Sequence, residues 1–172
     1  MDKIEMLISE EQIYQRLDEI AKQIDIDYEG KEIRLICILK GSLFVTCELA
    51  KRLKTPVTFD FLTASSYGDD TVSSGNVKII NDLSQDIHGK DVIIIEDIID
   101  TGITLDNLVN LLKQRNPNSL EICTLLSKPS RRLRDVNVKY IGFEIEDKFV
   151  VGYGLDYMQK YRNLPYIGVI NN

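Results

Sequence analysis

The chain of 172 residues contains a single histidine, His88, and only three cysteines. A histidine-based catalytic triad or a zinc site is not expected, because His88 would have to serve alone. Cys37, Cys47 and Cys123 each lie in apolar sequence surroundings, without CxxC spacing or a neighbouring histidine cluster. We therefore expect three buried, reduced thiols of a cytosolic protein, and neither disulfides nor metal ligands.

Long apolar runs and two common nucleotide-binding fingerprints are also missing. No run approaches the roughly 18 residues of a membrane helix, and residues 1–5 lack the charged-then-apolar layout of a signal peptide, so we expect a cytoplasmic protein. Neither GxxxxGK[ST] nor GxGxxG occurs, so nothing supports an ATPase or a dinucleotide enzyme. The net charge of −6 argues against a nucleic-acid or membrane surface, but it allows a local basic pocket for an anionic substrate.

The length, with 44% hydrophobic and 28% charged residues, suits one soluble domain. Ser9 and Gln12 form a capping-box pattern that predicts the start of a first helix packed on a sheet. Apolar segments predict strands at 33–39, 56–64, 76–82, 91–96 and 120–126, with helices at 43–53 and 104–115. This alternation predicts an α/β fold with a twisted, mostly parallel sheet flanked by helices on both faces.

The C-terminal third has a different pattern. Further strands are predicted at 139–145, 149–153 and 166–170. With the N-terminal helix, they are expected to form a small lid over the sheet. We therefore expect a single domain over residues 1–172, with a core at about 33–127 and a lid made of the N-terminal segment and about residues 128–172.

The segment 92–105 most needs a functional explanation. Four apolar residues predict a strand buried on both faces, and Glu96 and Asp97 fall where that strand would end. Asp100 follows, and Thr101-Gly102 opens an amphipathic helix. A helix N-terminus offers unpaired backbone N–H groups and partial positive charge, so it can bind a phosphate.

Several features of this turn favour a ribose 5-phosphate. Gly102 allows close approach of the backbone, and the hydroxyls of Thr101 and Thr104 can donate to phosphate oxygens. The carboxylates of Glu96 and Asp97 can accept hydrogen bonds from a sugar diol. In the alternative interpretation Asp100 or Thr101 only caps the helix, but a cap needs one acceptor, whereas three acids follow this strand.

Four other segments have both a functional and a plain structural interpretation. Lys40-Gly41-Ser42 follows a predicted strand, and a lysine before a glycine is usually a solvated turn. Residues 65–75 are small, polar and flanked by glycine, which suits a mobile loop or a surface hairpin. Lys128 precedes a basic cluster, which is more often solvated than functional. Phe149, followed by two valines, is most simply part of a core strand.

The run Glu96-Asp97-Ile98-Ile99-Asp100-Thr101-Gly102 closely resembles the phosphoribosyl-diphosphate (PRPP) binding motif of type I phosphoribosyltransferases. Lys128 and the segment 148–157 resemble the hypoxanthine-guanine branch of that family. The resemblance extends from roughly residue 33 to the C-terminus, with several motifs in the same order.

The resemblance implies specific roles on the PRPP side. Phosphate binding is implied for Asp100, Thr101, Gly102, Ile103 and Thr104, and ribose binding for Glu96 and Asp97. Pyrophosphate binding is implied for Lys40, Gly41 and Arg162, with a cis peptide between Lys40 and Gly41. Ser66 and Tyr67 resemble the start of the flexible loop that closes over the site.

On the purine side, the resemblance implies that Lys128 donates to the exocyclic oxygen of a 6-oxopurine. Phe149 would stack on the ring, and the backbone of Val150 would read its edge. Asp156 would lie near the base and a metal, and the final segment would be the hood that selects the base. The family often has alanine at the position of Gly154, and we expect little consequence from this difference.

The implied reaction is Mg²⁺-dependent transfer of the 5-phosphoribosyl group from PRPP to N9 of hypoxanthine or guanine. Asp100 is the candidate acid/base, and the candidate metal-binding residues are Glu96, Asp97 and Asp156. The expected partners are PRPP, a purine base and further copies of the chain in a homodimer or homotetramer, with no nucleic acid or membrane.

Two alternatives are a transferase that prefers xanthine or another base, and a non-catalytic regulator that senses PRPP or nucleotides. The acidic net charge argues against the regulator, as does the presence of Asp100, Lys40, Tyr67 and Arg162, because a sensor needs neither an acid/base nor a mobile loop.

Overall fold

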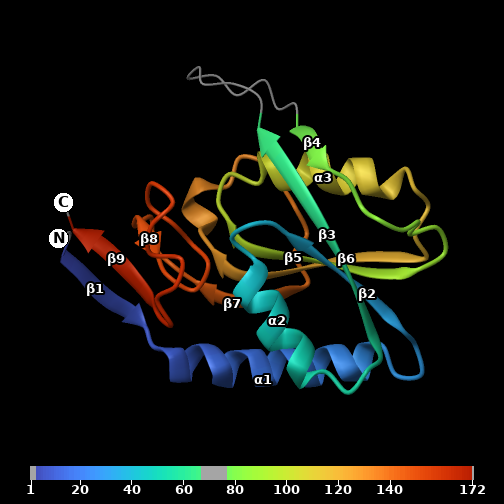
Figure 1. Cartoon of the computed structure of the whole chain (residues 1–172), viewed down its shortest axis with the longest axis horizontal. Helices are drawn as coiled ribbons and strands as arrows, with labels where there is room; N and C mark the ends of the chain where they lie inside the picture. Colours follow the sequence, from blue (N-terminus) through green and yellow to red (C-terminus); the bar gives the residue numbers. More distant parts are fainter. Residues whose placement is uncertain (1–2, 67–76, 172) are drawn as a thin grey trace.

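The computed structural model describes residues 3–66 and 77–171, whose main body is a six-stranded sheet (Figure 1). The strand order is β4-β3-β2-β5-β6-β7. Its strands are β2 (Ile33–Ile38), β3 (Val57–Ser66), β4 (Val77–Asn81), β5 (Asp91–Ile99), β6 (Ser119–Ser127) and β7 (Tyr140–Glu144). All neighbouring pairs are parallel except β3 and β4. The predicted mostly parallel sheet is therefore confirmed.

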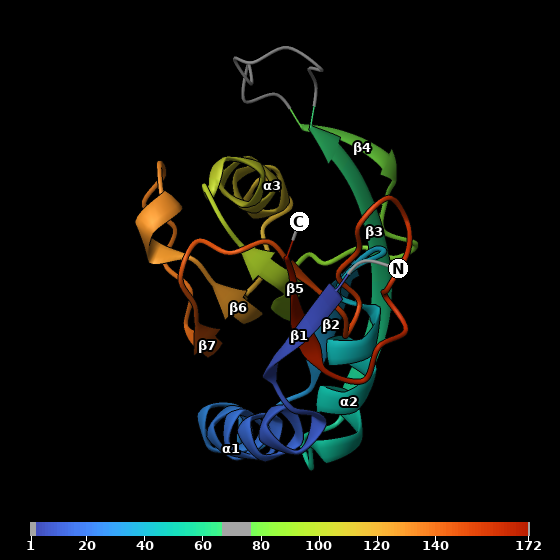
Figure 2. The same ribbon diagram turned by 90° about the vertical axis from the view of Figure 1, so that its left-hand side faces the viewer.

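Helices cover both faces of this sheet, also as predicted (Figure 2). Helices α1 (Glu10–Asp27) and α2 (Leu43–Arg52) pack in one apolar cluster with Ile93 and Ile95. Helix α3 (Ile103–Lys113) packs in the other cluster with Val92 and Ile94. Successive side chains of a strand point to opposite faces, so β5 needs apolar residues at every position to contribute to both clusters.

The start of α1 confirms the predicted capping box. The Ser9 hydroxyl accepts a hydrogen bond from the Gln12 backbone N–H at 3.2 Å, and the Gln12 side chain accepts one from the Ser9 N–H at 2.9 Å. The buried side of α1 includes Ile13, Leu17 and Ile24, and it faces the sheet as expected.

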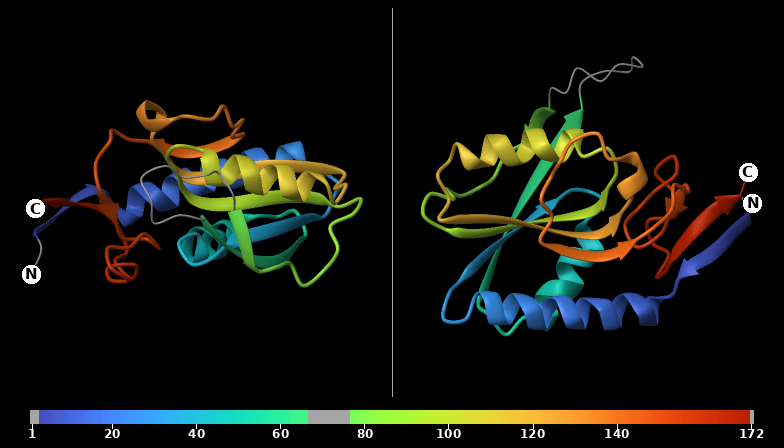
Figure 3. Two further views of the ribbon diagram at one scale, coloured as in Figure 1. Left: turned by 90° about the horizontal axis from the view of Figure 1, so that it is seen from above. Right: turned by 180° about the vertical axis from the view of Figure 1, so that it is seen from behind.

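A second, antiparallel sheet of three strands lies at one end of the molecule, where both described ends of the chain meet (Figure 3). It has the order β1-β9-β8, and its strands are β1 (Lys3–Ile8), β8 (Val150–Val151) and β9 (Ile167–Asn171). The N-terminal contribution to the expected lid is therefore the strand β1, whereas α1 packs on the main sheet.

The strand expected at 139–145 also belongs to the main sheet and not to the lid, because β7 pairs in parallel with β6. Contacts distant in sequence hold it there. The Tyr140 hydroxyl donates to Asp27 at 2.6 Å, and the Arg16 guanidinium donates to the carbonyl oxygens of Ile141 and Gly142. Such contacts with α1 leave no local signal in the sequence.

The three cysteines do not share one environment. Cys37 and Cys123 are buried as expected, whereas Cys47 is exposed. Helix α2 buries its other side, with Val45 and Leu49, so Cys47 faces outward. Within the residues described, no helix is long and apolar enough to cross a membrane.

Candidate active site

The turn between β5 and α3 surrounds a cavity of about 190 Å³. Glu96, Asp100, Thr101, Gly102 and Thr104 are among its lining residues. Gly102 precedes the first residue of α3 and has φ +81°, a conformation that glycine adopts without steric cost. The predicted strand and helix N-terminus therefore exist, and they enclose a space next to the backbone N–H groups of a helix start. The strand, however, continues to Ile99, so Glu96 and Asp97 lie within it and only Asp100 of the three acids lies in the turn.

Two partly buried carboxyl groups, Glu96 and Asp97, lie in the C-terminal half of β5, and Glu96 lines this cavity. Burial raises the pKa of Glu96 well above its ordinary value, and the neighbouring negative charge of Asp97 raises it further. One oxygen of Asp97 accepts a hydrogen bond from the Ile98 N–H at 2.7 Å. A pair of like charges kept from water favours a cation or hydrogen-bond donors beside it.

The loop after β2 lies directly against Asp97. A Cβ atom on Gly41 would overlap the carboxyl group of Asp97, so only glycine lets this backbone pass so close. The loop contains a cis peptide bond, but between Leu39 and Lys40. The expectation of a cis bond between Lys40 and Gly41 is therefore wrong by one residue, because a non-proline cis bond carries no residue-type signal that places it.

Gly154 contacts the other side of the same loop. It has φ +103°, and a Cβ atom on it would overlap the carbonyl oxygen of Gly41. Alanine, which the family often has at this position, would therefore require the Gly41 segment or this turn to shift, and the expectation that the difference has little consequence stays a prediction. The reason is a close approach of two backbone segments that are more than a hundred residues apart in sequence.

Lys40 and Arg162, both predicted to bind pyrophosphate, share one neighbour. The side-chain oxygen of Gln159 accepts from the Lys40 ammonium and from the Arg162 guanidinium, each at 3.4 Å. Arg162 also donates to the Gly154 carbonyl oxygen at 2.7 Å and pairs with Asp156 at 2.8 Å. The second carboxylate oxygen of Asp156 accepts from the Gln159 N–H at 2.8 Å. Two predicted cations thus converge on a single oxygen atom.

The segment after β6 is joined to the end of β5, whose residue Ile99 lines the cavity. Lys128 is 8% exposed, and its ammonium lies 3.6 Å from a carboxylate oxygen of Asp147. Its backbone N–H donates to the carbonyl oxygen of Ile99 at 2.9 Å, which ties this segment to the end of β5. Lys128 is therefore a nearly buried cation, and the interpretation as a solvated basic loop is wrong for it.

Phe149 directly precedes β8 and is 55% exposed, with its ring nearly perpendicular to that of Tyr157 and 5.6 Å between the centroids. Val150 is buried and pairs with Val169 of β9. The plain reading of a core strand therefore holds for Val150 but not for Phe149, which presents an open aromatic face.

The Asp100 side chain already has a hydrogen-bond partner. The Arg131 side chain, in the short 3-10 helix η1 (Pro129–Arg131), donates to its carboxylate at 2.8 Å. Arg131 also donates to Asp147 at 3.3 Å. The sequence interpretation missed Arg131, Asp147 and Gln159, because their only signal was membership of charged or polar loop segments.

Comparison with known proteins identifies the family of this chain. Residues 4–158 match the family described as "Phosphoribosyl transferase domain". This chain belongs to the phosphoribosyl transferase family.

Individual relatives of this phosphoribosyltransferase are similar over nearly their whole length. A hypoxanthine-guanine phosphoribosyltransferase of Staphylococcus aureus is 50% identical over 98% of this chain and 94% of its own. One of Bacillus subtilis is 49% identical over 96% and 92%. A crystal structure of the Bacillus anthracis hypoxanthine-guanine phosphoribosyltransferase, with HEPES in its active site, is 47% identical, covers 99% and 100%, and has a TM-score of 0.95.

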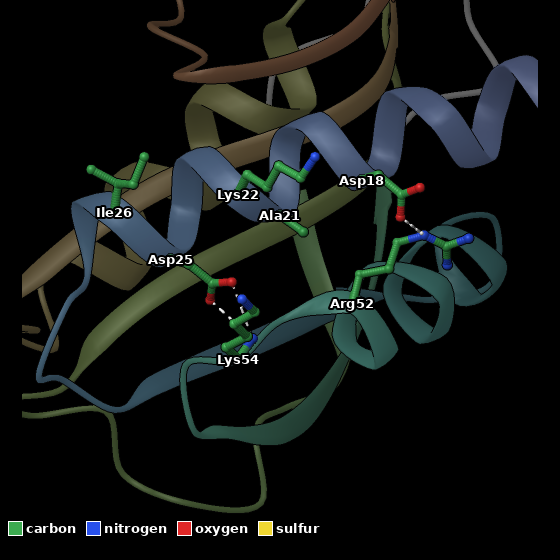
Figure 4. Close-up of a pocket in the computed structure, with 7 residues that line it drawn as sticks. All are labelled: Asp18, Ala21, Lys22, Asp25, Ile26, Arg52 and Lys54. Carbon is green, nitrogen blue, oxygen red and sulfur yellow. Dashed lines mark hydrogen bonds and ion pairs between the residues drawn. The ribbon is translucent and has the colours of Figure 1, made fainter.

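Two further features of this phosphoribosyltransferase are the expected flexible loop and a second, larger hollow. Ser66 is the last residue of β3, whereas Tyr67 and most of the expected flexible loop lie outside the described residues. A larger hollow of about 580 Å³ lies elsewhere, between α1 and the end of α2 (Figure 4). There Asp18 pairs with Arg52, and Asp25 accepts from the Lys54 and Thr55 backbones, so its acids already have partners. Its larger volume therefore does not make it a better candidate than the β5–α3 cavity.

Proposed function

We propose that this chain is a purine-salvage enzyme, which transfers the 5-phosphoribosyl group from PRPP to N9 of hypoxanthine or guanine. The products are IMP or GMP and pyrophosphate. The observation that carries this proposal is the β5–α3 cavity at the start of a helix, with Glu96 and Asp100 in its lining. Asp100 is connected to Lys128 through Arg131 and Asp147, and Gly41, next to Lys40, lies against Asp97. The relatives named hypoxanthine-guanine phosphoribosyltransferases support the same reaction.

The α3 N-terminus would hold the 5-phosphate. The Thr101 and Thr104 hydroxyls and the backbone N–H groups of Gly102 and Ile103 are the donors for its oxygens. Thr101 and Thr104 line the cavity, and the Ile103 N–H already donates to the Thr101 hydroxyl at 3.4 Å. Phosphate binding here needs no positive side chain, because the helix start supplies the partial charge.

The pyrophosphate would lie between Lys40 and Arg162. Both cations now donate to the Gln159 side-chain oxygen, which occupies a place that a phosphate oxygen could take. The Arg162 guanidinium suits this role because it can fork onto two oxygens. The backbone of Gly41, held between Asp97 and Gly154, would contribute a further donor.

The purine would lie between Lys128 and Phe149. The exposed ring of Phe149 offers a face for stacking, and the Val150 backbone would read the purine edge. An ammonium has only donors, so Lys128 favours a 6-oxo over a 6-amino purine. Asp156, close to Tyr157 and Phe149 in the chain, lies near the same region.

In the reaction, the bond from C1′ to the pyrophosphate oxygen breaks and the bond from C1′ to N9 forms. Positive charge develops on the sugar as pyrophosphate leaves, as in glycosyl transfer generally. Glu96 and Asp97 would fix the ribose hydroxyls. Asp100, as a general base, would take or share the proton that the purine imidazole loses as N9 attacks.

Mg²⁺ fits the residues present. Glu96 and Asp97 offer oxygen ligands, which this ion prefers, and burial with mutual repulsion makes a neighbouring cation favourable. Among the described residues no cluster of three or more His, Cys, Asp or Glu side chains could hold a metal, so substrate phosphates would complete the coordination. When bound, the ion would neutralise charge on the leaving pyrophosphate. Asp156 would first have to release Arg162 or Gln159.

We also propose a cytoplasmic location and a homodimer or homotetramer. Phe59 and Phe61 on β3 are each 44% exposed, and a subunit interface would cover such large apolar side chains. Sedimentation analysis tests the assembly.

One assay tests the proposed reaction. The protein is incubated with PRPP, Mg²⁺ and, separately, hypoxanthine, guanine, xanthine or adenine, and the nucleotide formed is measured. We expect IMP and GMP, with little product from adenine. Predominant formation of XMP would assign the enzyme to xanthine, and no nucleotide from any base would contradict the proposal.

A further inference from the structure

Four alternating charges run along one side of the proposed purine site. The Asp100 carboxylate accepts from Arg131 at 2.8 Å, and Arg131 donates to one oxygen of Asp147 at 3.3 Å. The other oxygen of Asp147 lies 3.6 Å from the Lys128 ammonium. The candidate base and the candidate purine-binding lysine are therefore connected through one arginine and one aspartate.

Stability does not explain this arrangement. The side chains of Asp100, Arg131 and Asp147 are 41%, 46% and 51% exposed, and ion pairs this exposed contribute little to folding. The backbone already fixes the loop, because Lys128 donates to Ile99 and the N–H groups of Leu133 and Arg134 donate to the Thr101 carbonyl oxygen.

Orientation does explain it. A guanidinium is planar and carries five donors, so it can hold two carboxylates in a set relation, which a lysine does less well. Asp100 rotates freely about its side-chain bonds unless a partner restrains it. The Lys128 ammonium, at the end of a flexible chain with a side chain only 10% exposed, has Asp147 as its charged partner.

We propose that Arg131 and Asp147 are positioning residues, with Arg131 orienting the Asp100 carboxylate and Asp147 orienting the Lys128 ammonium. The inference rests on the proposed function and deepens it. A purine bound there presents its imidazole edge to Asp100 and its 6-oxo group to Lys128, so the separation of the two protein groups must match the ring.

Substitution of Arg131 and substitution of Asp147 should change different kinetic parameters. Arg131→Gln leaves Lys128 with its partner but frees Asp100, so it lowers kcat by about ten- to hundredfold, the loss that misplacement by about 1 Å can cause. The KM for PRPP then stays within about twofold of its original value. Asp147→Asn instead raises the KM for hypoxanthine and admits some adenine. Arg131→Lys keeps the positive charge but lacks the planar guanidinium that can bond to two carboxylates, so its kcat lies between those of Arg131→Gln and the unaltered protein.

Arg134→Gln is the matched control. Arg134 is exposed and lies in the same loop, and its replacement by glutamine removes the same charge. Among the described residues, the arginine that bonds to Asp100 and Asp147 is Arg131 and not Arg134. We expect it to match the unaltered protein in kcat, in both KM values and in the midpoint of thermal unfolding. We expect the unfolding midpoint of Arg131→Gln to be unchanged as well.

The experiment is steady-state kinetics on these variants with hypoxanthine, adenine and PRPP, together with thermal unfolding. The inference is overturned if Arg131→Gln has the kcat of Arg134→Gln, if its kcat falls only in parallel with the unfolding midpoint, or if Asp147→Asn leaves purine recognition unchanged. An unaltered protein that forms no nucleotide would overturn the proposed function and this inference together. An active one with a normal Arg131→Gln variant would overturn the inference alone.

Discussion

The substitution Gly154→Ala tests how the pyrophosphate side of the site is built. Gly154 has φ +103°, which a residue with a Cβ atom adopts only under strain, at a cost of about 1–3 kcal/mol. The added Cβ atom would also overlap the carbonyl oxygen of Gly41, and such overpacking typically costs about 1–3 kcal/mol. The two terms together predict a loss of roughly 4 kcal/mol in the free energy of unfolding.

The free-energy cost of Gly154→Ala can appear as a less stable protein, as weaker PRPP binding, or as both. For a chain of this size, each kcal/mol lowers Tm by about 2–4 °C, so an unrelaxed variant unfolds roughly 8–16 °C lower. If the Lys40-Gly41 segment moves away instead, the fall in Tm is smaller, but the backbone of Gly41 and the Lys40 ammonium leave their positions. The KM for PRPP then rises, while the KM for hypoxanthine changes little.

Substitutions at two other glycines separate the cost of a positive φ from the cost of a Cβ atom that overlaps a neighbour. Gly30 and Gly89 have φ +73° and +66°, and a Cβ atom on either would meet no heavy atom within 4 Å. Gly30→Ala and Gly89→Ala therefore carry only the conformational cost. Compared with these two control variants, Gly154→Ala should have a clearly lower Tm, a clearly higher KM for PRPP, or both. Thermal unfolding and PRPP kinetics measure the two quantities. Equal behaviour of all three variants would refute the reasoning.

Four further substitutions have specific expected outcomes. Asp100→Asn removes the candidate base and should lower kcat by about 10²-fold or more, measured as IMP formation. Phe149→Ala removes the exposed ring and should raise the purine KM by about tenfold, with the KM for PRPP unchanged. Lys128→Gln can accept as well as donate a hydrogen bond, so AMP formation from adenine should increase. Asp60→Asn should destabilise the protein by about 1–3 kcal/mol at neutral pH, because Asp60 is 3% exposed and accepts from three backbone N–H groups. Burial alone would raise the pKa of Asp60, but these hydrogen bonds outweigh it and the pKa is lowered. The Asp60 contribution is therefore complete above about pH 4 and is lost as the pH falls through the lower folded-state pKa, so the difference between the two proteins should shrink in acid.

Each of these expectations has a contrary result. An unchanged kcat with a higher KM for PRPP would make Asp100 a binding residue, and a selective PRPP defect in Phe149→Ala would contradict stacking. Continued exclusion of adenine by Lys128→Gln would place selectivity elsewhere. For Asp60, the control is Asp135→Asn at an exposed aspartate, and denaturant unfolding that gives both variants equal stability at every pH would contradict the hydrogen-bond argument.

The parts of the site that were predictable are local. The apolar run before Glu96, the glycine at 102 and the following amphipathic helix predicted a strand, a turn and a helix start, because side-chain period and backbone preference act over a few residues. The capping box at Ser9 followed for the same reason. The parallel sheet followed from the alternation of such elements.

The errors arose where distant segments meet. The strand β7 joined the main sheet through its pairing with β6 and its contacts with α1. Gly154 touches Gly41, and Arg131 matters because it reaches Asp100. No window of sequence around any one of these residues contains its partner.

The sequence by itself thus determined the repeating strand and helix pattern, the helix start at Gly102 and the set of charged residues available for chemistry. The tertiary structure alone decided which of those residues face one another: Gly41 between Asp97 and Gly154, Gln159 between two cations, and Arg131 between two carboxylates. The physical reason is that hydrophobic period and turn preference are local properties of the chain, whereas a contact between backbone atoms or charges depends on how the whole sheet and its loops pack.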